Sequence, residues 1–85
     1  MSIDAVIDRV TRNADGTARL HLRPREPGGR VGQPSLTVLN PPPNLEAAVG
    51  TEIWGGADAI MVGRETRWAD RVGYTRIRLV PPKGR

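Results

Sequence analysis

Apolar and polar residues alternate with a period of two along much of this chain, and this alternation limits its possible folds more than any other feature. Ala18, Leu20 and Leu22 alternate with charged or polar neighbours, and Ile77 and Leu79 repeat the pattern near the end of the chain. A period of two places successive side chains on opposite faces of a β-strand, whereas a helix has a period of about 3.6. The sequence therefore predicts an all-β protein.

Glycine and proline clusters divide the alternating runs into short strands. The first run is rich in Val and Ile but alternates poorly, so we expect that strand to bend or to carry a bulge. Asn44 can begin a short helical turn near 44–49, and Gly50 can end it. We expect strands at 3–11, 18–23 and 35–39, then this turn, then two or three further strands drawn from 51–54, 59–62, 67–69 and 74–80.

A chain of 85 residues forms one domain. We expect a single small barrel over residues 1–80 and a frayed tail at 81–85. Three strands, a helical turn and two or three more strands give a small twisted barrel of five to six strands. This order resembles the OB-fold, a five-stranded barrel with a helical element between its third and fourth strands. An SH3-like barrel is the competing architecture.

The residues that carry enzyme chemistry are scarce. The chain has no cysteine and a single histidine, His21, which lies on the polar face of its strand. Asp4 and Asp8 share one face by period two, and we expect them to offset arginines on a neighbouring strand. An active site needs a nucleophile, a base or a metal within mutual reach. The sequence therefore predicts a non-enzymatic protein without metal or cofactor.

Nothing in the sequence indicates a membrane segment or a secretory signal. The N-terminus has no basic leader followed by an apolar run. The longest apolar stretch, at 59–62, has about four residues, whereas a spanning helix needs about 20. We therefore expect a cytoplasmic protein that does not contact membranes.

Positive charge is concentrated at the end of the chain. The net charge is +4, from 13 basic and 9 acidic residues. Residues 1–63 hold six Arg and seven acids, a net of −1, and residues 64–85 hold six Arg, one Lys and two acids, a net of +5. A concentrated basic segment is typical of a protein with an anionic partner.

Two stripes of outward-facing residues carry much of this charge on the predicted strands. They are Arg19, His21 and Arg23 on one strand, and Tyr74, Arg76 and Arg78 on the last strand. Residues two apart on a strand are separated by about 6.6–6.8 Å, close to the spacing of phosphates along one nucleic-acid strand. The sequence does not fix the register, so it leaves open whether the two stripes adjoin.

Aromatic residues lie among these arginines. A base can stack on Trp68 or Tyr74, which contributes about 1–3 kcal/mol per base. We expect Trp54 to pack in the core instead, because the chain has no phenylalanine to fill space. The candidate polyanion-binding residues are Arg19, Arg23, Arg64, Arg67, Trp68, Arg71, Tyr74, Arg76 and Arg78.

The sequence thus predicts a small β-barrel binding module that contacts a polyanion, most simply single-stranded nucleic acid. The alternative is a structural, adaptor or oligomerisation subunit, such as an accessory protein of a phage or mobile element. Such a subunit would contact copies of itself or a larger protein through the loop 24–34 and the prolines at 41–43.

Overall fold

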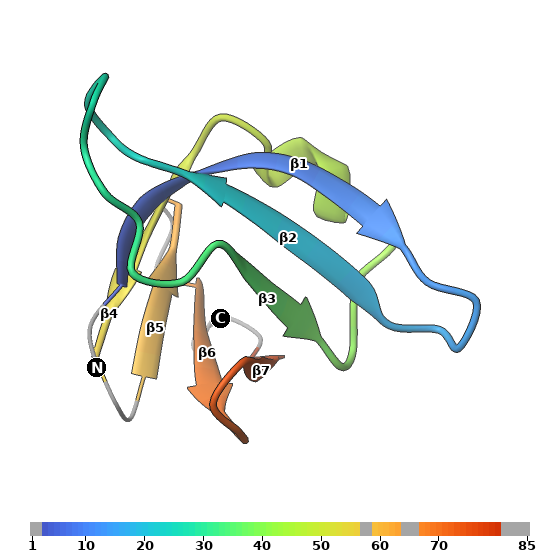
Figure 1. The fold of residues 1–85 in the computed structure, drawn as a ribbon. Helices are drawn as coiled ribbons and strands as arrows, with labels where there is room; N and C mark the ends of the chain where they lie inside the picture. Colours follow the sequence, from blue (N-terminus) through green and yellow to red (C-terminus); the bar gives the residue numbers. More distant parts are fainter. Residues whose placement is uncertain (1–2, 57–58, 64–66, 81–85) are drawn as a thin grey trace.

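A closed barrel of seven strands makes up the fold (Figure 1). The computed structural model describes residues 3–56, 59–63 and 67–80, and of Ala59, Arg67 and Trp68 it describes the backbone alone. The strands are β1 (Ile3–Arg12), β2 (Ala18–Arg23), β3 (Ser35–Val38), β4 (Glu52–Gly55), β5 (Ala59–Val62), β6 (Arg67–Arg71) and β7 (Arg76–Val80). The prediction of an all-β barrel is confirmed. The predicted number of five to six strands is wrong, because all four segments after the helical turn join the barrel.

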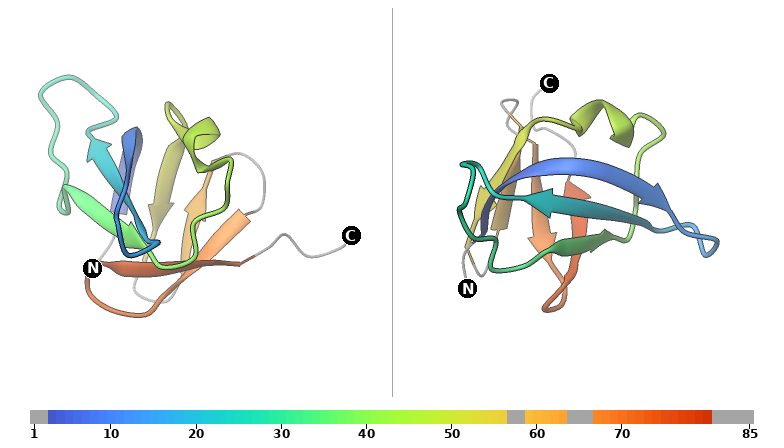
Figure 2. Two further views of the ribbon diagram at one scale, coloured as in Figure 1. Left: turned by 90° about the vertical axis from the view of Figure 1, so that its right-hand side faces the viewer. Right: turned by 45° about the horizontal axis from the view of Figure 1, so that its top comes forward.

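The strands follow the order β1-β2-β3-β7-β6-β5-β4, and β4 closes the barrel by pairing with β1 (Figure 2). All neighbouring strands are antiparallel except β3 and β7, which are parallel. The parallel pair means that the chain does not simply wind up and down around the barrel. It places the last strand directly beside the third.

The predicted irregularity of the first strand is confirmed as a β-bulge. The register with β2 shifts between Ile7 and Arg9, so the alternation restarts at that point. Ile7 is buried in the barrel, Arg9 is exposed, and Val10 packs against the core. A bulge adds one residue to a strand and re-aims the side chains that follow it. Here it turns Arg9 to the outer surface.

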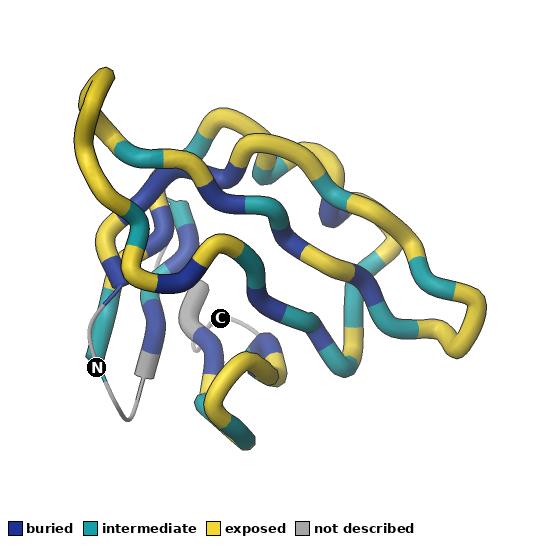
Figure 3. Tube along the Cα trace, in the orientation of Figure 1, coloured by how far each residue is buried: buried dark blue, intermediate teal, exposed yellow. Residues whose placement is uncertain are grey.

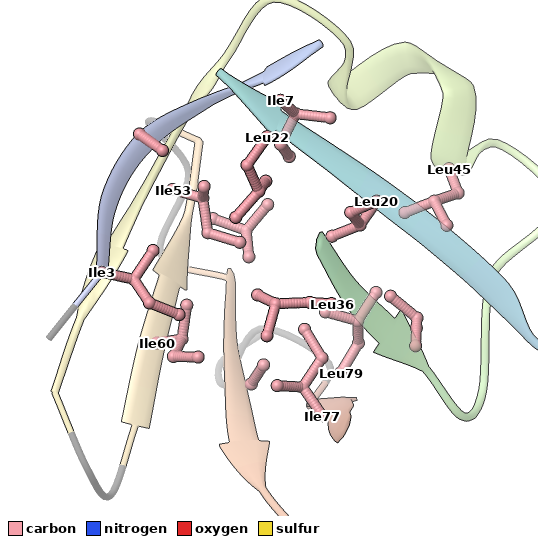
Figure 4. Packing of buried hydrophobic residues seen from close by; sticks show 14 of the residues in the cluster. Ile3, Ile7, Leu20, Leu22, Leu36, Leu45, Ile53, Ile60, Ile77 and Leu79 are labelled. Atoms are coloured by element: carbon pink, nitrogen blue, oxygen red, sulfur yellow. The ribbon is translucent and has the colours of Figure 1, made fainter. Parts of the chain in front are cut away.

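Aliphatic side chains from all seven strands and the helical turn form the core (Figure 4). Along β2, buried and exposed residues alternate as the sequence predicts (Figure 3). Ala18 and Leu20 have no exposed surface, and Arg19 between them is exposed. The largest fully buried side chains are Ile7, Leu20, Leu36, Val38, Leu45, Ile53, Ile60 and Ile77.

A side chain completes the seam between β3 and β7, where few residues pair. Asn40 follows β3, and its Nδ2 donates to the Leu79 carbonyl over 2.9 Å while its Oδ1 accepts the Leu79 N–H over 2.8 Å. The carboxamide thereby substitutes for a peptide group and extends the parallel ladder. Buried backbone groups at this seam are satisfied in this way.

The short helical turn forms where the sequence predicts it, as the 3₁₀ helix η1 (Leu45–Ala48). Asn44 precedes it, but its side chain makes no capping hydrogen bond. Gly50 has a φ of +88°, a conformation that favours glycine. Leu45 packs into the core, so the turn covers one side of the barrel beside β1.

Arg12 at the end of β1 holds this turn in place. Its Nη2 and Nε donate to the two carboxylate oxygens of Glu46 over 2.7 and 2.8 Å. The same Nη2 also donates to the carbonyls of Pro42 and Pro43 over 3.0 and 3.2 Å. A two-pronged pair of this kind is stronger and more directional than a single contact.

We expect the Glu46 carboxylate to make the fold sensitive to acid. Its hydrogen bonds from Arg12 lower the pKa of Glu46 from 4.5 to about 2. A carboxyl pKa that is lower in the folded than in the unfolded state stabilises the protein at pH values above the unfolded-state pKa. This contribution to the free energy of unfolding is lost as the pH falls from about 4.5 toward 2. Urea unfolding at a series of pH values measures the effect. Glu46→Gln should lose stability near neutral pH and show a shallower decline in acid.

Glu26→Gln is the matched control for this experiment. Glu26 is an exposed loop residue and forms no ion pair within the described part of the chain. This variant should keep the acid sensitivity of the parent protein. An equal decline in the parent and in Glu46→Gln would contradict the assignment.

Candidate nucleic-acid interface

The two basic stripes lie on one continuous outer surface. Arg19 on β2 is the register partner of Thr37 on β3, and Thr37 is the partner of Arg76 on β7. Two strand spacings amount to about 9–10 Å, so the backbones at Arg19 and Arg76 are this far apart with β3 between them. The tertiary structure thus brings together the two stripes that the sequence left unplaced. We call the outer surface of β1, β2, β3 and β7 the basic face.

Small hydroxyl residues line the middle of the basic face. Ser35 and Thr37 of β3 are half-buried, while Arg19 and Arg76 on the flanking strands are exposed. Short side chains between two rows of long ones leave room for a chain of phosphates to approach. Hydroxyl and guanidinium groups both donate hydrogen bonds to phosphate oxygens.

β1 adds two residues that the sequence reasoning missed. Arg9 is the register partner of His21, and Thr11 is the partner of Arg19. Both are exposed. Strict alternation along β1 would place Arg9 on the same side as Ile7, inside the barrel, and only the bulge turns it outward. The poor alternation of the first strand was the one sequence signal for this.

His21 is held at the centre of this arrangement. Its Nε2 lies 2.8 Å from the Thr11 hydroxyl oxygen. Partial burial, and then the positive charges of Arg9 and Arg19, lower the pKa of His21 below its ordinary 6.5, while Asp8 opposes this shift. The imidazole is therefore neutral at pH 7.

Four arginines of the basic face have no acidic partner. Within the described ranges, Arg9, Arg19, Arg76 and Arg78 form no ion pair, although Asp70 is the register partner of Arg78. The paired arginines are elsewhere or at the edge of the face: Arg12 with Glu46, Arg23 with Asp8 at 3.4 Å, and Arg25 with Asp4 and Glu52 at 3.2 Å each. Unpaired guanidinium groups are available to a ligand.

Arg71 and Tyr74 lie at the β6–β7 hairpin and differ in exposure. The Nη1 of Arg71 donates to the Tyr74 carbonyl over 2.8 Å, and its Nε and Nη2 are buried with no hydrogen-bond partner among the described residues. Arg71 is therefore not part of the basic face. The Tyr74 side chain is 65% exposed, at the edge of the face two residues before Arg76. The Tyr74 carbonyl also accepts from the buried Gln33 over 2.8 Å, which ties the hairpin to the start of β3.

The expectations for the two tryptophans have different outcomes, because only the side chain of Trp54 is described. Trp54 is 47% exposed on the outer surface of β4, so the prediction that it packs in the core is wrong. The inward positions of β4 are filled by Ile53 and its neighbours from other strands. Trp68 occupies a β6 position in register with Met61 and Val80, and its side chain, like that of Arg67, is outside the described part. Arg64 and the predicted tail 81–85 also lie outside the described residues.

The predicted role of the two N-terminal carboxylates is confirmed for Asp8, whose partner is on the neighbouring strand β2, whereas the partner of Asp4 is in the loop after β2. Asp8 pairs with Arg23, and Asp4 pairs with Arg25. Asp4 and Arg25 also line a polar recess of about 350 Å³ beneath the loop that follows β2. These two acids therefore neutralise one arginine at the edge of the basic face and one behind it.

No group of three His, Cys, Asp or Glu residues suited to a metal ion occurs in the part of the chain that is described. Likewise, none of the helices described there is long and apolar enough to cross a bilayer. Comparisons with protein-family models, with curated proteins and with solved structures find no match for this chain.

Proposed function

We propose that this protein is a non-enzymatic binding module that contacts single-stranded nucleic acid through the basic face. The observation that carries the proposal is the set of four arginines that form no ion pair with a described residue, around a strand lined by hydroxyl groups. In this proposal Arg9, Arg19, Arg76 and Arg78 contact phosphates. A base stacks on Tyr74 at the edge of the face.

The size of the face supports a short, single-stranded footprint. β3 has four residues and is about 13 Å long, and with its flanking strands it accommodates a few nucleotides. Sequence-tolerant binders of single strands combine a positive path for the backbone with aromatic platforms for the bases. The described surface offers both, at adjoining positions.

The architecture gives independent support. A helical turn between the third and fourth strands and a parallel contact of the third strand with the last resemble the OB-fold, from which this barrel differs by two additional strands. In OB-folds the surface of strands two and three and the adjoining loops bind oligonucleotides. In our proposal the outer surface of β2 and β3, within the basic face, plays the corresponding role.

Titration with an oligothymidylate of about 12 nucleotides tests the proposal, with tryptophan and tyrosine fluorescence as the readout. If four phosphates are neutralised, log K should fall against log salt with a slope of about −3. This slope corresponds to an affinity loss of about fiftyfold between about 50 and 200 mM salt. No binding at the lower salt concentration, or binding that salt does not weaken, would contradict the proposal.

A second candidate function is docking to a protein, and the exposure of Trp54 favours it. Trp54 is 47% exposed on the outer surface of β4, and its register partner on β5 is the half-buried Met61. Exposed apolar surface is typical of protein contacts. Light scattering on the titration samples tests this function. A stable oligomer that neither salt nor oligothymidylate changes would favour the adaptor or oligomerisation role.

A further inference from the structure

We infer that Arg9, His21 and Arg19, together with the Thr11 hydroxyl, form a phosphate subsite that takes up a proton when the anion binds. The inference rests on the proposed function, since the anion is a phosphodiester of the bound strand. The inference adds pH regulation to the proposed function, because the protein should bind nucleic acid more tightly in mildly acidic solution.

The first argument is the placement of the groups. Arg9 faces His21 across the β1–β2 ladder, and Arg19 precedes His21 by two positions on the same face of β2. Two arginines therefore flank the imidazole, and the bulge at Ile7/Arg9 is what brings the first of them there. A phosphate seated between these arginines would lie against the histidine.

The second argument is the hydrogen bond of His21. With its proton on Nδ1, the neutral imidazole accepts at Nε2 from the Thr11 hydroxyl, over 2.8 Å. The protonated imidazole donates from both nitrogens, so the same contact then requires the Thr11 oxygen to accept. The hydroxyl hydrogen is released and can turn to a phosphate oxygen. Protonation thus supplies one positive charge and one additional donor.

The third argument is the electrostatic surroundings of His21. The charged groups that face it are Arg9 and Asp8 from β1 and Arg19 on its own strand, while β3 presents the uncharged Ser35. Asp8 is engaged by Arg23 at 3.4 Å. In the free protein the two arginines disfavour a third positive charge. A bound phosphate cancels their field and stabilises the imidazolium.

The sign of the pH effect follows from linkage. The free protein keeps His21 neutral until the pH falls below its lowered pKa, and the bound anion raises that pKa. Binding is then coupled to proton uptake between the two values, and the affinity rises as the pH falls through this window. One additional cation corresponds to about a fivefold to tenfold gain at about 50 mM salt.

Oligothymidylate is the probe, because its bases do not titrate between about pH 5 and pH 8. We expect the parent protein to bind about fivefold to tenfold more tightly at the acidic end. Calorimetry in two buffers of different ionisation enthalpy should show uptake of a fraction of a proton. His21 is the only histidine of the chain. His21→Gln should therefore lose the acid enhancement, so that its affinity no longer rises as the pH falls and no proton is taken up.

Two further variants test whether the pH dependence comes from the charge of His21, from the Thr11 hydroxyl, or from positive charge in general. Thr11→Val should retain part of the enhancement, because the charge remains while the hydroxyl donor is lost. Arg30→Gln, in the exposed loop that follows β2, removes a positive charge that does not act on His21 and should leave the shape of the pH profile unchanged. A parent protein that binds with a flat pH profile and no proton uptake would overturn this inference and leave the proposed function intact. Absence of binding at every pH would instead overturn the proposed function.

Discussion

Replacing Arg19 and Arg76 together by glutamine should abolish most of the affinity for single-stranded nucleic acid. The two residues flank β3 on the basic face and form no ion pair with any described residue. Each phosphate contact contributes about 0.7 to the slope of log K against log salt for single strands. We expect the slope to become shallower, from about −3 to about −1.5. The affinity at about 50 mM salt should decrease about fiftyfold.

The matched control removes the same charge from another part of the molecule. Arg25 and Arg30 line the recess beneath the loop that follows β2, away from the centre of the basic face. Arg25→Gln with Arg30→Gln should weaken binding only slightly and leave the slope close to that of the parent. Equal losses in the two double variants would show that net charge, rather than the basic face, determines binding.

Truncation of Leu20 should have the largest effect on stability. Its side chain is fully buried, and it lies opposite Val10 of β1 and Leu36 of β3. A buried Leu→Ala substitution costs about 2–5 kcal/mol. The total stability of a domain of this size is about 4–13 kcal/mol. Leu20→Ala should therefore move the urea midpoint sharply down or leave the protein unfolded.

Arg19→Gln is the control for that experiment and also a test of the strand assignment. Arg19 is adjacent to Leu20 in the sequence but exposed on the opposite face of β2. Its replacement should change the free energy of unfolding by less than about 0.5 kcal/mol, while weakening the binding of nucleic acid. Similar losses of stability in both variants would contradict the alternation of β2 in this barrel.

Much of the candidate interface follows from local sequence patterns. The alternation around Leu20 and Ile77 placed their apolar neighbours inside the barrel and the arginines between them outside, as the structure shows. The helical turn before Gly50 also formed where its residues indicated. Such features depend on a few adjacent residues, so they can be inferred without knowledge of the partners.

Other outcomes depended on contacts between distant parts of the chain. Trp54 was expected in the core and is exposed, because neighbours such as Ile53 fill the interior of the barrel. Arg71 was assigned to the interface and instead donates to the Tyr74 carbonyl. Neither composition nor periodicity distinguishes an arginine that reaches a ligand from one that satisfies a carbonyl.

The sequence by itself determined the β class, the inward and outward faces of the regular strands and the concentration of positive charge. The tertiary structure alone decided that seven strands close into one barrel and that Arg19 and Arg76 share a surface. It also decided that a bulge turns Arg9 toward His21. The physical reason is the sequence separation of the residues involved. The face on which a side chain lies is set by period two within one strand, whereas register and strand order are set by the packing of side chains that lie far apart in the chain.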